Sequence, residues 1–344
     1  LIDPLIEHFN LKVHHHLRVM QPNQSLASLT ARMLEGLDQL LVHQSPRLVI
    51  GQGDTASVLA GSMASFFRQI PFAHVEAGLR TGDLRSPFPE ELNRVLTSRM
   101  SQWHFAPTEL ARAHLLAESI PASQIFLTGN TVIDALQLSL SKGDAGQTGR
   151  ERGPDDLWQP LLASVRPLIL ITAHRRENFG EPLARICHAV RRLASRYFDH
   201  DFVYPVHPNP QVRQTVTALL ADQPNIHLMP PADYASFCRL MQKARLILSD
   251  SGGVQEEAPA LGKPVLVLRT ETERPEAVSL GCNRLVGTET AAIENAVVEV
   301  LENTTIYQAM ATAGSPYGDG RAAKRIERVL RRHLIGDEPV TTSV

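Results

Sequence analysis

The stretch LILSDSGGVQEEAPALGKPVLVLRTETERPEA, residues 246–277, decides the fold around which the rest of the chain is organised. Its apolar run 246–248 is short enough for a buried strand. A Ser-Gly-Gly turn (251–253) follows, and glycine lets the backbone approach a ligand closely. Residues 254–261 then predict a helix, which a glycine and a proline end. Such a strand–turn–helix unit directs free backbone N–H groups and the positive end of a helix dipole at one point, which suits a phosphate.

Charged residues near this turn favour a nucleotide over an ordinary strand-to-helix connection. Taken alone, the Ser-Gly-Gly turn fits both interpretations. The carboxylate pair Glu256–Glu257 follows within the predicted helix, and a second charged turn lies at 273–276. Carboxylates suit ribose hydroxyls, and the guanidinium of Arg274 suits a diphosphate. The stretch therefore predicts a nucleotide site.

Composition limits the class of protein. A length of 344 residues favours two domains, and a net charge of −2 argues against general affinity for nucleic acid. The three cysteines are far apart and show no disulfide framework or zinc spacing, so we expect a reducing cytoplasm. No apolar run reaches the length of a membrane span, and no signal peptide is evident. The sequence shows no metal cluster and no dinucleotide Gly-x-Gly-x-x-Gly motif, so we expect no metal and no cofactor.

Short apolar runs alternate with helical patterns along the whole chain. This alternation predicts an α/β fold with parallel, doubly wound sheets. The polar, glycine-rich residues 141–154 break the pattern and indicate a linker between domains. We expect an N-terminal Rossmann-like domain at 1–140, a linker at 141–166 and a C-terminal nucleotide-binding Rossmann-like domain at 167–318. Further strands are expected at 48–50, 72–75, 103–106, 125–128, 168–172, 203–206, 226–229 and 265–268.

Three acidic residues lie near the ends of elements on one side of the first predicted sheet. Asp54 precedes a helix, and on its own it is best explained as an N-cap. Glu90 and Glu91 open another helix, where the helix dipole accounts for one of them. That explanation hardly applies to Glu76, which follows a strand. A cluster of Asp54, Glu76 and Glu90 could raise one pKa and separate an acid from a base.

Basic residues follow two strands of the second domain. His174 and Arg175 come directly after a buried strand, where open α/β sheets bind ligands. Arg175 could hold a phosphate, and the position makes a merely solvated run improbable. His207 lies in a turn fixed by prolines, and a ligand role and a structural role fit it equally.

The chain closely resembles the non-hydrolysing UDP-N-acetylglucosamine 2-epimerases of the bacterial type. The signature is DSGGVQEEAPALGKPVLVLR followed by TETERPEA, and the other motifs agree with it over nearly the whole sequence. The family usually opens with a strand and a Gly-Thr-Arg-Pro-Glu turn, which this sequence lacks. That turn is expected to supply an arginine to the nucleotide phosphates. The resemblance implies two Rossmann-like domains facing each other across a cleft, as in GT-B glycosyltransferases. It also implies a homodimer and a basic helix at 319–335 that returns to the N-terminal domain.

The resemblance implies reversible conversion of UDP-GlcNAc to UDP-ManNAc, without a cofactor, by elimination of UDP to 2-acetamidoglucal and re-addition. The resemblance makes Asp54, Glu76 and Glu90 candidate acid/base residues, and it implies that His174 polarises or protonates the departing diphosphate. In some members the residue matching His207 lies near a second, regulatory nucleotide-sugar site, for which Glu91 is another candidate. The residues implied in binding UDP are Arg175, Phe237 beside the uracil, Ser251, Gly252, Gly253, Glu257 and Arg274.

Three alternatives stay open on sequence alone. A GT-B glycosyltransferase would share the fold and the nucleotide half. A hydrolysing epimerase would release UDP and free ManNAc. A relative that binds nucleotide sugars without turnover is the third, because the first strand–helix unit is missing.

Overall fold

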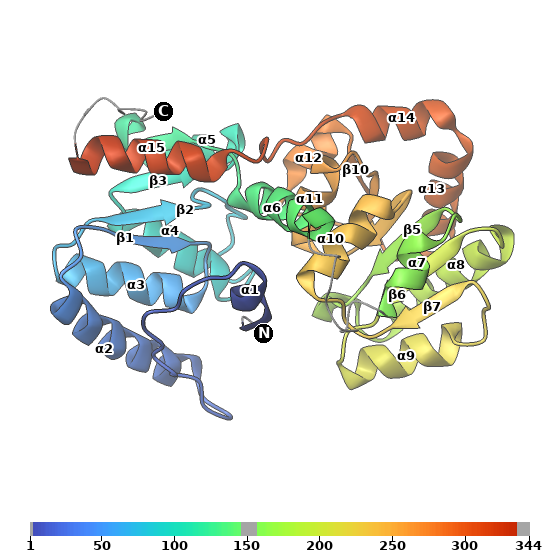
Figure 1. Ribbon diagram of the computed structural model, residues 1–344, viewed down its shortest axis with the longest axis horizontal. Helices are drawn as coiled ribbons and strands as arrows, with labels where there is room; N and C mark the ends of the chain where they lie inside the picture. Colours follow the sequence, from blue (N-terminus) through green and yellow to red (C-terminus); the bar gives the residue numbers. More distant parts are fainter. Residues whose placement is uncertain (1–2, 146–156, 336–344) are drawn as a thin grey trace. The chain divides into compact units, whose positions relative to one another are not determined.

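The computed structural model describes residues 3–145 and 157–335, which form two compact units (Figure 1). The N-terminal unit contains Lys12–Asp134 and the segment from Tyr317 onward. The C-terminal unit contains Ala135–Pro316 together with the segment up to Leu11, which includes the helix α1 (Asp3–His8). Each unit is thus built from two separate segments of the chain.

The N-terminal unit contains a four-stranded parallel sheet. Its order is β1 (Val49–Gln52), β2 (Phe72–Val75), β3 (Trp103–Ala106), β4 (Ile125–Leu127). Its helices are α2 (Leu26–Gln44), α3 (Ala56–Phe67), α4 (Glu90–Met100), α5 (Glu109–Ala117), the start of α6 (Thr131–Ala145) and α15 (Ala322–Ile335), with a short 3-10 turn at Ala122–Gln124.

Helices cover both faces of this sheet. Successive residues of a strand point to opposite faces, so one strand packs against helices on both sides. The ring of Phe72 lies against Gly51 and Gly61, at the α3 face. The next residue, Ala73, points the other way and packs with Ile326 and Leu330 of α15. In Figure 1, α15 and α3 accordingly lie on opposite sides of the strands.

The segment from Tyr317 enters the N-terminal unit through a close glycine contact. A side chain on Gly129, whose φ is +83°, would lie 3.2 Å from the Cα of Gly318. The N–H of Asn130 donates to the carbonyl of Tyr317 at 2.6 Å. The Asp134 carboxylate accepts from the first two N–H groups of α15, each at 3.0 Å. Helix α15 is therefore fixed to the unit by its start as well as by its apolar face.

The C-terminal unit contains a six-stranded parallel sheet. Its order is β10 (Asn283–Leu285), β9 (Val265–Val267), β8 (Leu246–Ser249), β5 (Leu168–Thr172), β6 (Asp201–Pro205), β7 (Ile226–Met229). The strands run outward from β5 in one direction and from β8 in the other, so the topological switch point lies between these two strands. This is the doubly wound Rossmann order. The α/β class and its Rossmann-like units are confirmed.

Two apolar cores flank this sheet, one on each face. The helices that contribute to them are the C-terminal part of α6 together with α7 (Gln159–Ala163), α8 (Glu181–Arg196), α9 (Pro210–Leu220), α10 (Tyr234–Lys243), α11 (Gly252–Ala260), α13 (Thr290–Glu302) and α14 (Thr304–Thr312). The unit also contains α12 (Pro275–Leu280). Within the expected linker 141–166, α6 continues to Ala145 and α7 is helical, while residues 146–156 lie outside the described residues. Among the described helices, none combines the length and apolar character of a membrane span.

Candidate functional site

The switch point of the C-terminal sheet is organised by a fully buried carboxylate, Asp250. Its Oδ2 accepts from the backbone N–H groups of His174 and Arg175, each at 2.8 Å, and from the Asn178 amide at 2.9 Å. Its Oδ1 lies 3.5 Å from Nδ1 of His174. Because Asp250 follows β8 and His174 follows β5, one side chain joins the two loops at the point where such sheets bind ligands. Asp250 was given no role on the basis of the sequence.

His174 is partly exposed and stacks on a second histidine. Its ring lies parallel to that of His207, with centroids 5.4 Å apart and planes 6° apart. Burial lowers the pKa of His174, Asp250 acts to raise it, and His207 and Arg175 lower it further. The structure thus brings together two histidines that sequence reasoning treated separately.

The glycine turn becomes the first turn of α11, so the helix starts at Gly252 instead of the expected 254. Ser251 is its N-cap residue, and the described contacts show no side-chain cap at this end. A side chain on Gly252 would lie 2.6 Å from the guanidinium of Arg274, which packs directly over it. A larger residue at position 252 would therefore have to displace the guanidinium of Arg274 from the helix start.

Carboxylates hold Arg274 in place. It donates to Glu256, which is buried, and at 2.7 Å to Glu273. Glu273 also pairs with Arg269 at 2.8 Å and lies 3.5 Å from Arg175. Burial alone would raise the pKa of Glu273, but the charges of Arg274 and Arg269 lower it to about 2. Three arginines thus form a basic cluster around Glu273, and Glu256 is a second anchor of Arg274. The sequence did not identify either carboxylate as an anchor.

Glu257 lies one residue beyond and has a different environment. Its carboxyl group is buried and accepts from the hydroxyl of Tyr234 at 2.6 Å. Burial raises the pKa of Glu257 to about 7, in spite of the Tyr234 hydrogen bond, and the nearby Glu256 raises it too. Phe237, one turn beyond Tyr234 on α10, is partly buried against the core. The predicted ribose and uracil contacts thus come from two helices of one unit.

In the N-terminal unit, two of the predicted carboxylates lie at neighbouring strand ends. Asp54 follows β1 and Glu76 follows β2, and these strands pair up to Gln52 and Val75. A side chain on Gly53 would lie 3.6 Å from a carboxylate oxygen of Glu76. Glu76 has a φ of +65°, a left-handed conformation that costs a residue with a side chain about 1 kcal/mol or more. Such strain is typical of functional sites.

Asp54 is fixed from α4 instead of acting as a helix cap. Thr55 is the N-cap residue of α3. Asn93 donates to the Asp54 carbonyl at 2.8 Å, and the buried Arg94 lies 3.1 Å from the Asp54 carboxylate. Glu90 is the first residue of α4 and one turn before Arg94, so this helix contributes both groups.

Glu91 has a structural environment. It is 1% exposed, its Oε1 accepts from the backbone N–H groups of Thr81 and Gly82, and its Oε2 lies 3.5 Å from Arg94. Arg94 therefore joins two carboxylates, one buried and one partly exposed. The sequence alone gave no signal for Arg94, which resembles an ordinary residue of a polar helix.

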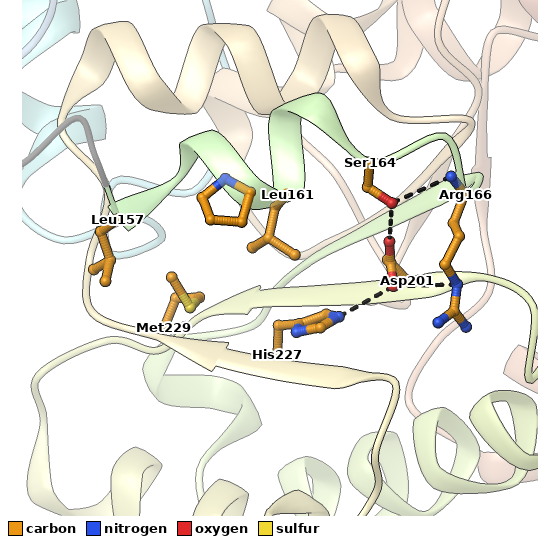
Figure 2. Close-up of a pocket in the computed structure, with 8 residues that line it drawn as sticks. Leu157, Leu161, Ser164, Arg166, Asp201, His227 and Met229 are labelled. Atoms are coloured by element: carbon orange, nitrogen blue, oxygen red, sulfur yellow. Dashed lines mark hydrogen bonds and ion pairs between the residues drawn. The ribbon is translucent and has the colours of Figure 1, made fainter.

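A pocket of about 360 Å³ lies apart from all of these groups, between α7 and the edge strand β7. Figure 2 shows that its polar side chains pair with one another: Asp201 accepts from Ser164 at 2.7 Å and lies 3.1 Å from His227. None of the predicted site residues lines it. Its lining residues are Leu157, Pro160, Leu161, Ser164, Arg166, Asp201, His227 and Met229.

The Rossmann order, the glycine-started helix and the basic cluster at the switch point define a nucleotide-binding α/β protein. The chain belongs to the UDP-N-acetylglucosamine 2-epimerase family, whose model matches residues 2–331. It is 46% identical over 335 residues to the UDP-N-acetylglucosamine 2-epimerase of Escherichia coli K12, covering 97% of this chain and 89% of that protein.

Solved structures agree with this assignment. The crystal structure of UDP-GlcNAc 2-epimerase from Neisseria meningitidis bound to UDP-GlcNAc has a TM-score of 0.88 and 46% identity, covering 96% of this chain and 88% of that one. The crystal structure of UDP-GlcNAc 2-epimerase from Methanocaldococcus jannaschii in complex with UDP-GlcNAc and UDP has a TM-score of 0.77 and 33% identity. The match covers 95% of this chain and 87% of that one. The family inferred from the sequence motifs is confirmed.

Proposed function

We propose that this protein catalyses the reversible epimerisation of UDP-GlcNAc to UDP-ManNAc at C2. The observation that carries the proposal is the 46% identity and TM-score of 0.88 to an epimerase whose structure contains UDP-GlcNAc. Relatives matched over nearly the whole chain are named as epimerases, so a glycosyltransferase or a relative without turnover is not favoured.

The chemistry requires elimination because the C2–H of a hexose is too weakly acidic for simple deprotonation. One base removes the C2 proton as the C1–O bond to UDP breaks, which leaves 2-acetamidoglucal. A proton then returns to the opposite face of C2 as UDP adds back to C1. The route needs two proton-transfer groups and a positive environment for the departing diphosphate.

We assign the proton transfers to Asp54, Glu76 and Glu90. Their positions at the ends of β1, β2 and the start of α4 support this, as does the strained backbone of Glu76. His174 is assigned to the diphosphate oxygen that leaves C1. Its partial exposure at the switch point supports the assignment.

We assign UDP to the switch point of the C-terminal unit. The N–H groups at the start of α11 and the guanidinium of Arg274 suit the diphosphate, and Glu257 suits the ribose hydroxyls. Support comes from the close packing of Arg274 on Gly252 and from the buried carboxyl of Glu257. The full set assigned to UDP is Arg175, Phe237, Ser251, Gly252, Gly253, Glu257 and Arg274.

The regulatory, oligomeric and cellular assignments rest on the family. His207 remains a candidate for regulation, and its stacking on His174 would connect such a site to the reaction. Glu91 is a candidate too, although its contacts within the N-terminal unit already explain its burial. We further propose a homodimer located in the cytoplasm.

Incubation of the 344-residue chain with UDP-GlcNAc in D2O tests the reaction, with NMR used to observe C2. We expect deuterium at C2 together with UDP-ManNAc. Free ManNAc would instead indicate a hydrolysing enzyme. UDP binding without any exchange would reject catalysis by this chain.

Nucleotide affinity is expected to depend on pH through Glu257. Its pKa of about 7 in the free protein means that the carboxyl is largely protonated below neutral pH. Ribose hydroxyls donating to the carboxylate favour its ionised form, so binding releases a proton. UDP affinity should therefore rise with pH by up to about tenfold per unit below pH 7 and level off above it.

Calorimetry in buffers of different ionisation enthalpy measures this proton release directly. Glu257→Gln should bind UDP more weakly above pH 7 and lose the dependence. Glu299→Gln, which alters a half-exposed carboxylate of α13 outside the assigned UDP contacts, serves as the control. An unchanged slope in Glu257→Gln would assign the proton to another group.

A further inference from the structure

The buried carboxylate at the switch point has one oxygen that the folding contacts do not use. All three hydrogen bonds accepted by Asp250 go to Oδ2, from two backbone N–H groups and the Asn178 amide. Among the described residues, none donates a hydrogen bond to Oδ1. A buried acceptor of this kind requires a donor. Nδ1 of His174, 3.5 Å away, is positioned to be that donor.

The ring of His174 is constrained on two sides. His207 stacks on one face with a centroid separation of 5.4 Å. The backbone on either side is held as well, since the Ala173 carbonyl accepts from the buried Tyr204 hydroxyl at 2.8 Å and the His174 N–H donates to Asp250. With Nδ1 directed at Asp250, Nε2 is the ring nitrogen left for a ligand.

We propose that Asp250 is a positioning residue that keeps a proton on Nδ1 of His174 and stabilises its imidazolium form. The inference rests on the proposed epimerisation. In the elimination step, Nε2–H of protonated His174 gives its proton to the diphosphate oxygen as the C1–O bond breaks. The electron pair of that bond stays with the oxygen, and the neutral ring keeps its remaining proton on Nδ1. Re-addition of UDP returns the proton to Nε2.

The substitution Asp250→Asn distinguishes the proposed role of Asp250 in holding the Nδ1 proton of His174 from its role in anchoring the two loops. The amide oxygen can still accept from the backbone N–H groups of His174 and Arg175, so the turn can form. The amide NH2 then faces Nδ1, which must become an acceptor, and the neutral ring carries its proton on Nε2. Loss of the carboxylate charge disfavours the imidazolium beside Arg175 and His207. Turnover is expected to fall about 100-fold, because general acid catalysis contributes on the order of 10² or more.

Nitrogen-15 NMR of His174 gives a readout that does not depend on turnover. We expect the neutral ring to carry its proton on Nδ1 in the unsubstituted protein and on Nε2 in Asp250→Asn. The protonated form should titrate at lower pH in the variant. The matched control is Asn178→Ala. It removes the hydrogen bonds that the Asn178 amide donates to Oδ2 of Asp250 and to the Leu268 carbonyl, and it leaves the Asp250 carboxylate in place. It should lower thermal stability and leave the Nδ1 tautomer unchanged.

The outcomes distinguish this inference from the proposed function. Absence of C2 exchange in the unsubstituted protein rejects the epimerase and leaves the tautomer measurement intact. A proton on Nε2 of neutral His174 in the unsubstituted protein overturns the inference, whether or not the variant folds. The same holds if Asp250→Asn keeps the Nδ1 tautomer and turns over like Asn178→Ala.

Discussion

Glu76→Gln is expected to reduce deuterium exchange at C2 of UDP-GlcNAc by about 10²–10⁴-fold, the contribution typical of a positioned acid or base. Glutamine preserves the size of the side chain and adopts the φ of +65° at a similar cost to glutamate. Folding stability should therefore change little, and the loss would be chemical. Exchange is measured by NMR in D2O, and the fold by circular dichroism and thermal unfolding.

The same exchange measurement can assign the three carboxylates. Asp54→Asn and Glu90→Gln are compared with Glu76→Gln, in each direction of the reaction. A variant that loses exchange from UDP-GlcNAc more than from UDP-ManNAc identifies the group on that face of C2. Glu109→Gln is the matched control, because this glutamate of α5 is 72% exposed and contacts Arg112 on the surface. Near-normal exchange in all three folded variants would remove these residues from the mechanism.

Arg94→Met is expected to destabilise the N-terminal unit by about 3–5 kcal/mol, as observed when one partner of a buried ion pair is removed. The Arg94 side chain is 5% exposed, and its guanidinium lies between Asp54 and Glu91, whose side chain is 1% exposed. Methionine fills much of the same volume but supplies no charge. Glu91 would then remain buried as an anion with only the backbone donors of Thr81 and Gly82.

Urea unfolding followed by tryptophan fluorescence measures this loss. Trp103 belongs to the N-terminal unit and Trp158 to the C-terminal unit, so a Trp158→Phe background reports the first alone. Arg112→Met, which breaks an exposed pair with Glu109, should cost at most about 1 kcal/mol. Adding Glu91→Gln to Arg94→Met should recover part of the stability, because no charge is then left buried. A cost equal to that of Arg112→Met would show that the buried pair is not needed.

The sequence was sufficient to predict a strand or helix where the local pattern of residues agrees with the place of that element in the fold. β2 at Phe72–Val75 and β5 at Leu168–Thr172 are short, mostly apolar runs that are buried along their whole length, and both were placed with the correct ends. β10 was missed because its residues Asn283 and Arg284 are polar, and its pairing with β9 only becomes evident in three dimensions. α7 was missed because it lies beside the polar run that predicted the linker.

The residues proposed to contact the ligand were easier to predict than the residues that hold them in place. Glu76 and His174 follow buried strands, so topology alone indicates that they lie at ligand-binding strand ends. Asp250 and Glu256 act through partners on other elements, and Arg94 contacts Asp54 as well as Glu91, which lies three residues earlier on the same helix. Arg94 has the sequence environment of a surface helix, yet it is buried and lies between two carboxylates. Positions of this kind require the packed structure.

The segment from Tyr317, which joins the N-terminal unit at the contact between Gly129 and Gly318, affects the order in which the two units can fold during synthesis. The first unit to leave the ribosome is the last to be completed, since α15 covers one face of its sheet and is synthesised after the entire C-terminal unit. At translation rates of about 5–20 residues per second, the apolar face formed by Ala73, Val75 and Phe105 stays uncovered for many seconds. A premature stop after Pro316 would leave the C-terminal unit complete, whereas the N-terminal unit would lack α15 and expose one face of its sheet.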